Sequence, residues 1–488
     1  MVQFILNDQL INADQASGST MLDYIRYYKR LVGTKIGCRE GDCGACTILV
    51  GEFDYENNSE GKLIYRSMTS CLMPLGNAHG KHIVTVEGIN MSGLPGSQNS
   101  KELSPVQQAL VDTNGTQCGF CTIGFVMSLT GFVLNDKAKQ YDDAIASIDG
   151  NICRCTGYKS IERAAAILSE KITDKPVENT IAWLVNNNFI PDYFIRIKDR
   201  LRQLREKIKT DSSELIPVVQ KLILGGGTDL IVQKALTIKK ASVHHLFDAG
   251  HLQEIKMENG QCHIGAAVTV TAFAGSKTIQ DLFPRLHQYI KLISSTPIRN
   301  MATMAGNLVN ASPIGDMSIF FLALDSELEL NKNGRIRRIK LKDFYKGYKQ
   351  IDKEPDEIIE KIIFTPPVNN YFNFEKVSKR THLDIASVNS ACLLQMNKDG
   401  VIEDIHLSAG GVAAFPKYLS ETVHFLKGKT INPGILKEAI AVMNTEITPI
   451  SDARGTKEYK RLLLRQLLLA HFQIIAGNTT IKNILQPG

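Results

Sequence analysis

Eight of the ten cysteines fall into two groups whose spacing is typical of metal centres. In the first group, Cys38, Cys43 and Cys46 have the spacing C-x4-C-x2-C, and Cys71 follows 25 residues after Cys46. This is the plant-type spacing of a [2Fe–2S] site, in which thiolates hold the cluster from a tight loop. Glycines between the cysteines allow such a loop to fold around the cluster. Zinc is the alternative, but zinc sites favour paired C-x2-C motifs and Cys38 lies outside any such pair.

The second group combines a C-x2-C motif, Cys118 and Cys121, with a C-x-C motif, Cys153 and Cys155. Each motif lies at the end of a predicted helix, where unpaired N–H groups stabilise negative charge. Residues two apart point away from each other on a helix, so the C-x-C motif is expected on a non-helical turn. The group predicts a second iron–sulfur cluster, with a zinc site as the alternative.

A glycine-rich turn follows a short apolar strand in the middle of the chain. Leu224 precedes Gly225-Gly226-Gly227-Thr228-Asp229, and a helical stretch comes next. Successive N–H groups in such a turn form a nest for a pyrophosphate. The turn matches neither G-x-G-x-x-G nor a P-loop lysine motif, and by itself it is also compatible with a plain tight turn.

Residues 297–316 form a second glycine- and amide-rich stretch, and it shows no clear periodicity. We expect a long irregular loop, which inside a compact domain is usually functional. Its candidate donors and acceptors for a polar ligand are Thr303, Asn307, Ser312 and Asp316.

The elements around these motifs follow from hydrophobic periodicity and turn residues. A β-hairpin is expected over 4–11, a helix from Thr20 to Leu31, strands over 46–50, 62–65 and 82–86, and an exposed polar loop over 51–61. Ser104-Pro105 is typical of a helix start, and helical periodicity continues to about residue 170. Arg196–Lys209 predicts a solvated, basic linker helix, with a partner-docking surface as the alternative. Lys376–Arg380 is expected to be a solvated face.

Together, the cysteine motifs, Gln117-Cys118-Gly119-Phe120-Cys121 and Cys153-Arg154-Cys155-Thr156-Gly157-Tyr158 resemble the molybdenum hydroxylases, the family of xanthine dehydrogenase and aldehyde oxidase. The resemblance implies an α+β multidomain fold with a β-grasp [2Fe–2S] ferredoxin domain, a four-helix-type [2Fe–2S] domain, an α/β FAD-binding domain of the vanillyl-alcohol oxidase type and a C-terminal α/β flavoprotein domain. The expected boundaries are 1–87, 88–170, a linker over 171–215, 216–370 and 371–488.

The resemblance also assigns roles to residues. It places the cluster of Cys118, Cys121, Cys153 and Cys155 nearer the molybdenum cofactor and the other cluster nearer the flavin. Gln117 would contact the pterin. The turn from Leu224 to Asp229 would hold the FAD pyrophosphate, Thr303 and Asn307 would contact the phosphates, and Asp316 the ribose or adenine end. Tyr348 and Lys349 would lie near a nicotinamide nucleotide. No catalytic acid or base is expected in this chain.

By that resemblance, the chain is the small iron–sulfur/FAD subunit of a split xanthine dehydrogenase. It would pass electrons from a molybdenum site on a large partner subunit, where xanthine or hypoxanthine is oxidised, through two [2Fe–2S] clusters to FAD and then to NAD+ or O2. The same relay for an aldehyde or another N-heteroaromatic compound is the alternative, and a zinc-binding scaffold is the non-enzymatic one. A heterotetramer of two small and two large subunits and a role in purine catabolism are expected.

Composition favours a globular protein without nucleic acid or membrane partners. The formal charge of +6 is small for 488 residues, and no basic stripe interleaved with aromatic residues is present. The start of the sequence lacks the pattern of a signal peptide, and no apolar run approaches membrane-spanning length. We therefore expect a cytoplasmic protein with reduced cysteines.

Overall fold

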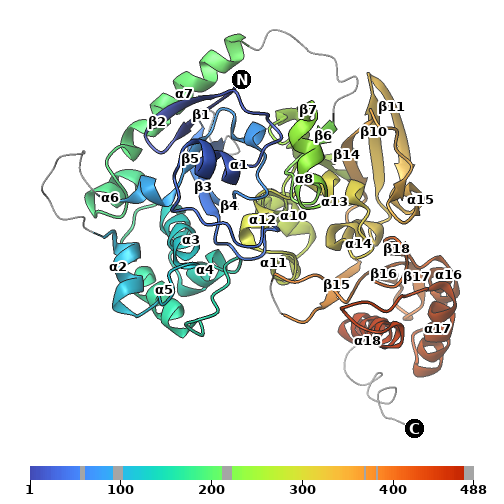
Figure 1. Ribbon diagram of the computed structural model, residues 1–488. Helices are drawn as coiled ribbons and strands as arrows, with labels where there is room; N and C mark the ends of the chain where they lie inside the picture. Colours follow the sequence, from blue (N-terminus) through green and yellow to red (C-terminus); the bar gives the residue numbers. More distant parts are fainter. Residues whose placement is uncertain (55–60, 92–102, 212–221, 368–369, 381–382, 477–488) are drawn as a thin grey trace, which may run out of the picture. The chain divides into compact units, whose positions relative to one another are not determined.

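The computed structural model describes residues 1–54, 61–91, 103–211, 222–367, 370–380 and 383–476 (Figure 1). The chain forms two compact units. The first comprises Met1–His245 with Ser295–Met301, and the second comprises Leu246–Ser294 with Ala302–Gly488. Among the described helices, none combines the length and the apolar character needed to span a bilayer.

The first unit begins with a five-stranded mixed sheet in the order β2-β1-β5-β3-β4, in which only the β1–β5 pair is parallel. Its strands are β1 (Val2–Leu6), β2 (Gln9–Ala13), β3 (Thr47–Asp54), β4 (Lys62–Thr69) and β5 (His82–Val84). The predicted hairpin is confirmed as β1 and β2. The predicted loop over 51–61 is wrong for residues 51–54, because they continue β3 and pair with β4; residues 55–60 lie outside the described residues.

The predicted helix from Thr20 to Leu31 is shorter in the structure. Thr20 caps helix α1 (Met21–Asp23), which continues as a π-helical turn, η1 (Tyr24–Tyr28). The chain leaves the helix at Lys29, because Arg30 takes a left-handed conformation with φ 56°. Two short 3-10 turns, η2 (Leu75–Ala78) and η3 (Val86–Ile89), flank β5.

Four helices form a second layer of this unit: α2 (Pro105–Asp112), α3 (Thr122–Leu134), α4 (Tyr141–Ser147) and α5 (Lys159–Lys171). Ser104 and Gln107 form a capping box at the start of α2, as the Ser-Pro signal predicts. Helix α3 is apolar along most of its length and packs against β3 and β4 (Figure 1). This packing joins the sheet and the helical layer into one hydrophobic core.

The predicted linker folds as helices α6 (Thr180–Asn186) and α7 (Phe194–Asp211). Ile197 and Leu201 of α7 are fully buried in the core of the first unit. The apolar face of this helix is therefore covered by other residues of the same unit, while Arg196 remains exposed. The first unit ends with β6 (Leu222–Leu224), α8 (Leu230–Lys240) and β7 (Val243–His245), and includes helix α12 (Thr296–Arg299).

The second unit contains a five-stranded sheet in the order β11-β10-β14-β9-β8. Its strands are β8 (Ile255–Glu258), β9 (Gln261–Gly265), β10 (Glu327–Lys332), β11 (Arg335–Lys340) and β14 (Ile358–Phe364). The surrounding short elements are η4 (Gly250–Leu252), α9 (Val270–Gly275), α10 (Lys277–Leu282), α11 (Leu286–Lys291), α13 (Met304–Asn310), α14 (Asp316–Leu322), α15 (Leu341–Phe344), β12 (Tyr345–Gly347) and β13 (Gln350–Ile351). The expectation of one irregular loop over 297–316 is wrong, because the stretch contains most of α12 and all of α13, helices too short to show a period.

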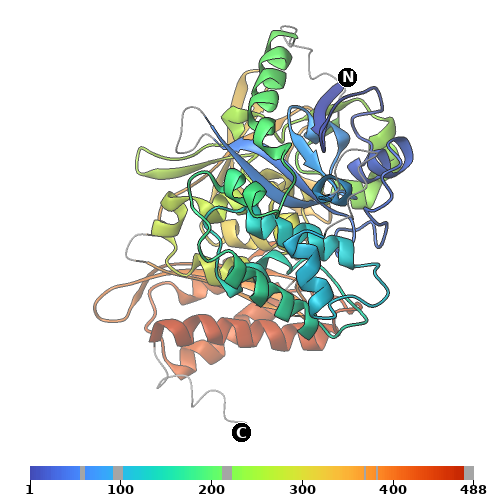
Figure 2. The ribbon, with the colours of Figure 1, turned by 90° about the vertical axis from the view of Figure 1, so that its left-hand side faces the viewer.

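A second sheet in this unit, β15-β16-β17-β18, is antiparallel and consists of β15 (Tyr371–Val377), β16 (Val388–Met396), β17 (Ile402–Gly410) and β18 (Lys417–Tyr418). Strand β16 is buried on both faces. Cys392 and Leu394 belong to the core beneath helices α16 (Ser420–Leu426), α17 (Pro433–Glu446) and α18 (Lys457–Ala476), whereas Ala391 and Leu393 face the larger core of this unit. Figure 2 shows these helices, in red, beside the strands.

Candidate functional site

The first cysteine group converges in the loop between η1 and β3 and at the end of β4. The Cys43 thiol is hydrogen-bonded to the Cys38 sulfur, and the buried Cys71 thiol to the buried Cys46 sulfur. The hydrogen bond between Cys71 and Cys46 is the main reason that the pKa of Cys46 is lowered and the pKa of Cys71 is raised. A thiolate at Cys38 is close enough to act on both groups, so the two pairs lie near each other. The four predicted ligands are thus brought together as two pairs, which is the donor set of a [2Fe–2S] cluster, whose two irons each take two protein ligands.

Backbone N–H groups of the loop point at these sulfurs. The N–H of Glu40 donates to the Cys38 sulfur over 3.3 Å, and the N–H of Cys38 donates to the Cys43 sulfur over 3.5 Å. The Cys43 thiol, with the backbone N–H groups of Glu40, Cys43 and Asp42, lowers the pKa of Cys38 to about 5. Thiolates are the form that binds metals, and hydrogen bonds to the sulfurs tune the potential of a bound cluster.

The second group also consists of two pairs, and it is more exposed. The Cys155 thiol lies 3.6 Å from the Cys118 sulfur, and Cys121 is hydrogen-bonded to Cys153. Cys118 and Cys155 are exposed, whereas Cys153 is buried. The N–H of Thr156 donates to the Cys153 sulfur over 3.4 Å. As predicted, the C-x-C motif lies on a non-helical turn, before α5.

None of the ten cysteines is in a disulfide. Across the described part of the chain, no three His, Cys, Asp or Glu side chains surround one point as they would a single metal ion. The arrangement of the eight thiols in pairs, with N–H groups directed at several sulfurs, fits [2Fe–2S] clusters.

The two cysteine loops are in direct contact with each other. The N–H of Ile152 donates to the carbonyl oxygen of Cys43 over 3.0 Å. The side chain of Asn151 donates to the Gly44 carbonyl over 3.2 Å and accepts a hydrogen bond from Ser128 over 2.7 Å. One hydrogen bond therefore links a ligand of the first group to the residue next to Cys153 of the second.

The approach of these loops is so close that only glycine fits at position 44. A Cβ there would lie 2.3 Å from the Gly150 carbonyl oxygen and 2.4 Å from the Asn151 amide nitrogen, and Gly44 has φ +67°. A Cβ at Gly124 of α3 would lie 2.2 Å from the Gly44 carbonyl oxygen. Sequence reasoning gave Gly44 a role in its own loop, but it missed Asn151 and Gly124, because their partners lie far away in the chain.

The triple-glycine turn lies beside the first cysteine group. The side chain of Asn77 donates to the Gly225 carbonyl over 3.0 Å, and a Cβ on Gly227 would lie 3.0 Å from the Leu72 carbonyl oxygen and 2.9 Å from Pro74. Gly227 has φ +87°, which favours glycine. The turn, with Thr228 and Asp229, leads directly into α8, as predicted, and its position fits a nest for a phosphate group.

The remaining predicted FAD residues belong to the second unit. Thr303 caps α13, accepting from the N–H of Gly306 over 3.3 Å, and Asn307 accepts from the N–H of Ser318 over 3.1 Å. The carboxylate of Asp316 accepts from Lys376 over 2.7 Å and from Asn389 over 2.6 Å. Their polar atoms therefore stabilise the local fold, and the FAD contacts of Thr303, Asn307 and Asp316 stay predictions.

Lys376 corrects one expectation. Its side chain is only 2 % exposed, because it forms an ion pair with Asp316 and donates to the Leu292 carbonyl over 2.7 Å. The solvated face predicted for Lys376–Arg380 is therefore wrong at its first residue. Arg380, by contrast, is half exposed.

Three other predicted residues lie near the surface. Gln117 is exposed immediately before Cys118. Tyr348 is 64 % exposed, and Lys349 donates to the carbonyl and side-chain oxygens of Asn310, each over 2.6 Å. The structure leaves the pterin and nucleotide roles of these residues as predictions.

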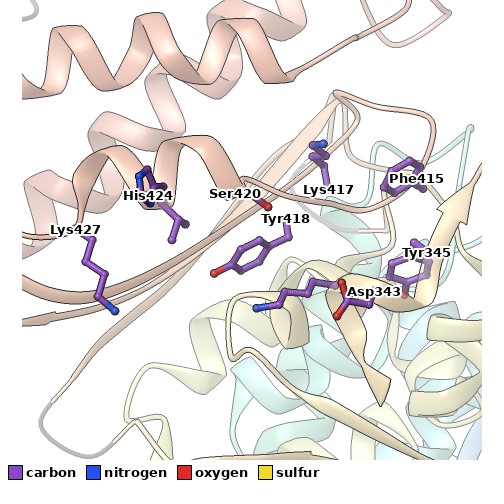
Figure 3. A pocket seen from close by; sticks show the side chains of 10 residues that line it. Asp343, Tyr345, Phe415, Lys417, Tyr418, Ser420, His424 and Lys427 are labelled. Atoms are coloured by element: carbon purple, nitrogen blue, oxygen red, sulfur yellow. The ribbon is translucent and has the colours of Figure 1, made fainter. Parts of the chain in front are cut away.

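A cavity of about 460 Å³ lies in the second unit (Figure 3). It is lined by Lys342, Asp343, Tyr345, Phe415, Lys417, Tyr418, Ser420, Val423, His424 and Lys427. Lys342 pairs with Asp325 over 3.1 Å, and Lys427 pairs with Asp404 over 2.9 Å. These two lysines are therefore already paired with carboxylates of the same chain.

Four family models match the chain. The 2Fe-2S iron-sulfur cluster binding domain matches residues 4–75, and the [2Fe-2S] binding domain matches residues 85–166. The FAD binding domain in molybdopterin dehydrogenase matches residues 209–367, and the CO dehydrogenase flavoprotein C-terminal domain matches residues 373–474. The chain belongs to the molybdenum hydroxylase family. The predicted multidomain α+β fold, with two [2Fe–2S] domains, a FAD-binding domain and a C-terminal flavoprotein domain, is thereby confirmed.

Similar full-length proteins of this family include xanthine dehydrogenases. The chain is 28 % identical to the xanthine dehydrogenase of Oryza sativa subsp. japonica, covering 96 % of this chain and 39 % of that protein. It is also 28 % identical to the xanthine dehydrogenase of Emericella nidulans, covering 91 % and 36 %. The chain thus spans less than half the length of these relatives.

Two solved structures are also similar to part of the chain. Reconstituted CO dehydrogenase from Oligotropha carboxidovorans is 28 % identical, with a TM-score of 0.48, over 50 % of this chain and 86 % of that chain. Quinoline 2-oxidoreductase from Pseudomonas putida 86 is 21 % identical, with a TM-score of 0.48, over 57 % and 94 %.

Proposed function

We propose that this chain is the electron-relay subunit of a xanthine dehydrogenase-type molybdenum hydroxylase, carrying electrons from a partner's molybdenum site to FAD and then to NAD+. The observation that carries the proposal is the hydrogen bond from the Ile152 N–H to the Cys43 carbonyl, 3.0 Å long. It links the two cysteine loops by main-chain atoms alone. Two clusters held by these loops would keep a fixed separation, which a relay requires.

The contacts of the first unit support an order for the relay. Cys118 and Cys155 are exposed, and Phe120 between the cysteines of the C-x2-C motif is 47 % exposed. This face is where a molybdenum-bearing partner would approach. The second loop is bonded to the first through Ile152 and Cys43, and the Leu72–Pro74 segment after Cys71 abuts the triple-glycine turn.

The clusters and FAD, when bound, supply the electron-accepting chemistry; the protein supplies position and electrostatics. The eight thiols would hold the iron. The N–H groups of Glu40 and Thr156 stabilise negative charge on Cys38 and Cys153. The turn from Leu224 to Asp229 would hold a phosphate group of FAD, and burial of Cys46 and Cys71 keeps water from their sulfurs.

Xanthine as substrate and NAD+ as acceptor rest on the similarity to xanthine dehydrogenases, and both belong to the proposal. So do the separate large subunit, the heterotetramer and a cytoplasmic location, in which thiols stay reduced. An aldehyde or another N-heteroaromatic substrate would use the same relay. The experiment therefore has to test the identity of the substrate separately from electron transfer through the clusters.

The test is anaerobic purification of the tagged chain from its native host, with measurement of iron, zinc, flavin and molybdenum. We expect about four irons per chain, from two [2Fe–2S] clusters, and a co-purifying molybdenum subunit. Xanthine should then bleach the visible absorbance, and NAD+ should restore it. If molybdenum co-purifies but xanthine does not bleach the visible absorbance, the substrate is an aldehyde or another heterocycle instead. Zinc in place of iron would refute the relay.

Cysteine variants make the assignment specific. Cys43→Ser and Cys118→Ser should each remove about half of the iron, because each belongs to a different cluster. Cys392→Ser is the control, since Cys392 is fully buried in the C-terminal core and belongs to neither group. Its iron content should equal that of the unchanged protein. Equal iron loss in all three variants would contradict the assignment of ligands.

A further inference from the structure

A seven-residue segment of the first unit touches both cysteine loops. Residues 295–301 belong to the first unit, although the chain on either side of them belongs to the second. The segment contains the short helix α12 and is well buried: Ser295, Pro297, Asn300 and Met301 are each less than 9 % exposed. The segment contacts each cysteine group both through hydrogen bonds and through a side chain packed against a glycine.

The polar contact is an ion pair with Asp149, the residue before Gly150 in the loop that leads to Cys153. The Arg299 guanidinium donates to one carboxylate oxygen of Asp149 over 2.7 Å, and the N–H of Thr296 donates to the other over 2.7 Å. Both charged side chains are only 11 % exposed. Pro297 covers Gly150, where a Cβ would lie 2.8 Å from the proline ring. This end of the segment therefore holds the second cysteine loop by charge and by packing.

The same segment reaches the first cysteine group. The side chain of Asn300 donates to the Ser67 carbonyl over 2.8 Å, in β4 just before Cys71. Ile298 abuts Gly41 of the first loop, where a Cβ would lie 2.7 Å from the isoleucine Cδ1. Gly41 has φ +82°, so this close approach also suits only glycine.

We propose that residues 295–301 form a strap that fixes the two cysteine loops relative to each other, with Asp149 and Arg299 as its positioning residues. The inference rests on the proposed relay, since it assigns the strap to keeping the spacing between the two clusters constant. The loops contact each other directly through the main-chain hydrogen bond from Ile152 to Cys43, the hydrogen bond from Asn151 to the Gly44 carbonyl and the close packing of Gly44 against Gly150. The strap adds a buried ion pair and packing that span both loops.

The test compares Asp149→Asn, which removes the charge and keeps the shape, with the unchanged protein. Hydrogen–deuterium exchange of residues 295–301 is measured on the metal-free and the iron-loaded chain, and the magnetic interaction between the two reduced clusters is measured by electron paramagnetic resonance. We expect exchange at least about tenfold faster in the variant, because the buried ion pair between Asp149 and Arg299 is lost. The iron content should not change, and the magnetic interaction should become weaker or heterogeneous.

Glu162→Gln is the matched control. It removes an ion pair of α5 with Lys159 whose side chains are 77 % and 31 % exposed, for lysine and glutamate respectively, so exchange and magnetic interaction should stay unchanged. Arg299→Lys keeps the positive charge beside Asp149, so residues 295–301 should keep most of their protection from exchange. This variant can be measured even if Asp149→Asn does not fold. Unchanged exchange and unchanged magnetic interaction in Asp149→Asn would overturn the strap. Absence of iron from the unchanged protein would instead refute the relay, while the exchange data on the metal-free chain would still decide the strap.

Discussion

The contact between the two cysteine loops can be tested with three glycine-to-alanine substitutions that separate its physical components. Gly157→Ala adds a Cβ at φ +64° with nothing within 4 Å, so it carries only the left-handed backbone penalty of about 1–2 kcal/mol. Gly124→Ala lies in helix α3 and carries only the clash, 2.2 Å from the Gly44 carbonyl oxygen. Overpacking costs about 1–3 kcal/mol, and the helix propensity of alanine returns about 1 kcal/mol.

Gly44→Ala carries both components, because it combines φ +67° with a Cβ 2.3 Å from the Gly150 carbonyl oxygen. The sum is a loss of about 2–5 kcal/mol in the free energy of unfolding. In a domain of roughly 150–250 residues, each kcal/mol lost from the free energy of unfolding lowers the melting temperature by roughly 2–4 °C. Calorimetry of the iron-loaded protein should therefore rank Gly44→Ala clearly below the other two variants.

Cluster absorbance of the same samples adds a second readout. Gly44→Ala should also lose iron, because the loop that carries Cys43 and Cys46 has to move away from Gly150. Gly157→Ala lies in the second loop and keeps its packing, so it controls for the effect of any substitution near a cysteine. A Gly44→Ala protein that melts no lower than Gly157→Ala would refute the close packing of the two loops, and with it the main support for the relay.

Two further predictions concern buried groups. Burial lowers the pKa of His471 to about 3, below the usual value of 6.5, so the unfolded chain takes up a proton between these values and the folded chain does not. Stability should therefore fall as pH drops from 6.5 to 3, by up to about 5 kcal/mol, and His471→Gln should flatten this loss in calorimetry at pH 7 and 4.5; an unchanged slope would contradict the assignment. Lys175 is fully buried and caps the C-terminal end of α3. It donates to the carbonyl of Val133 in the last turn of the helix and to the carbonyls of Asn135 and Ala138 just after it. Lys175→Met should lower the free energy of unfolding by about 1.5–3 kcal/mol or more, whereas the exposed Lys277→Met should leave the melting temperature unchanged; equal melting temperatures would contradict the capping role.

Sequence patterns were sufficient for features whose partners lie a few residues apart. The capping box at Ser104, the hairpin of β1 and β2 and the turn after Leu224 are all local, so residue type and spacing predict them. The cysteine spacing predicted two groups of thiols, because each loop presents its ligands over a short stretch. Buried ion pairs such as Lys376 with Asp316 were missed, since a lysine in a basic run gives no sign of a distant carboxylate.

The sequence alone therefore determined which residues could bind clusters and a dinucleotide, and which family the chain resembles. The tertiary structure decided what those sites touch. Ile152 meets Cys43, Gly44 fits against Gly150, and residues 295–301 return to Asp149 only after the helices and sheet have packed. Such contacts join residues more than 100 positions apart, and they depend on the burial of hydrophobic faces such as that of α3 against β3, which no local pattern specifies.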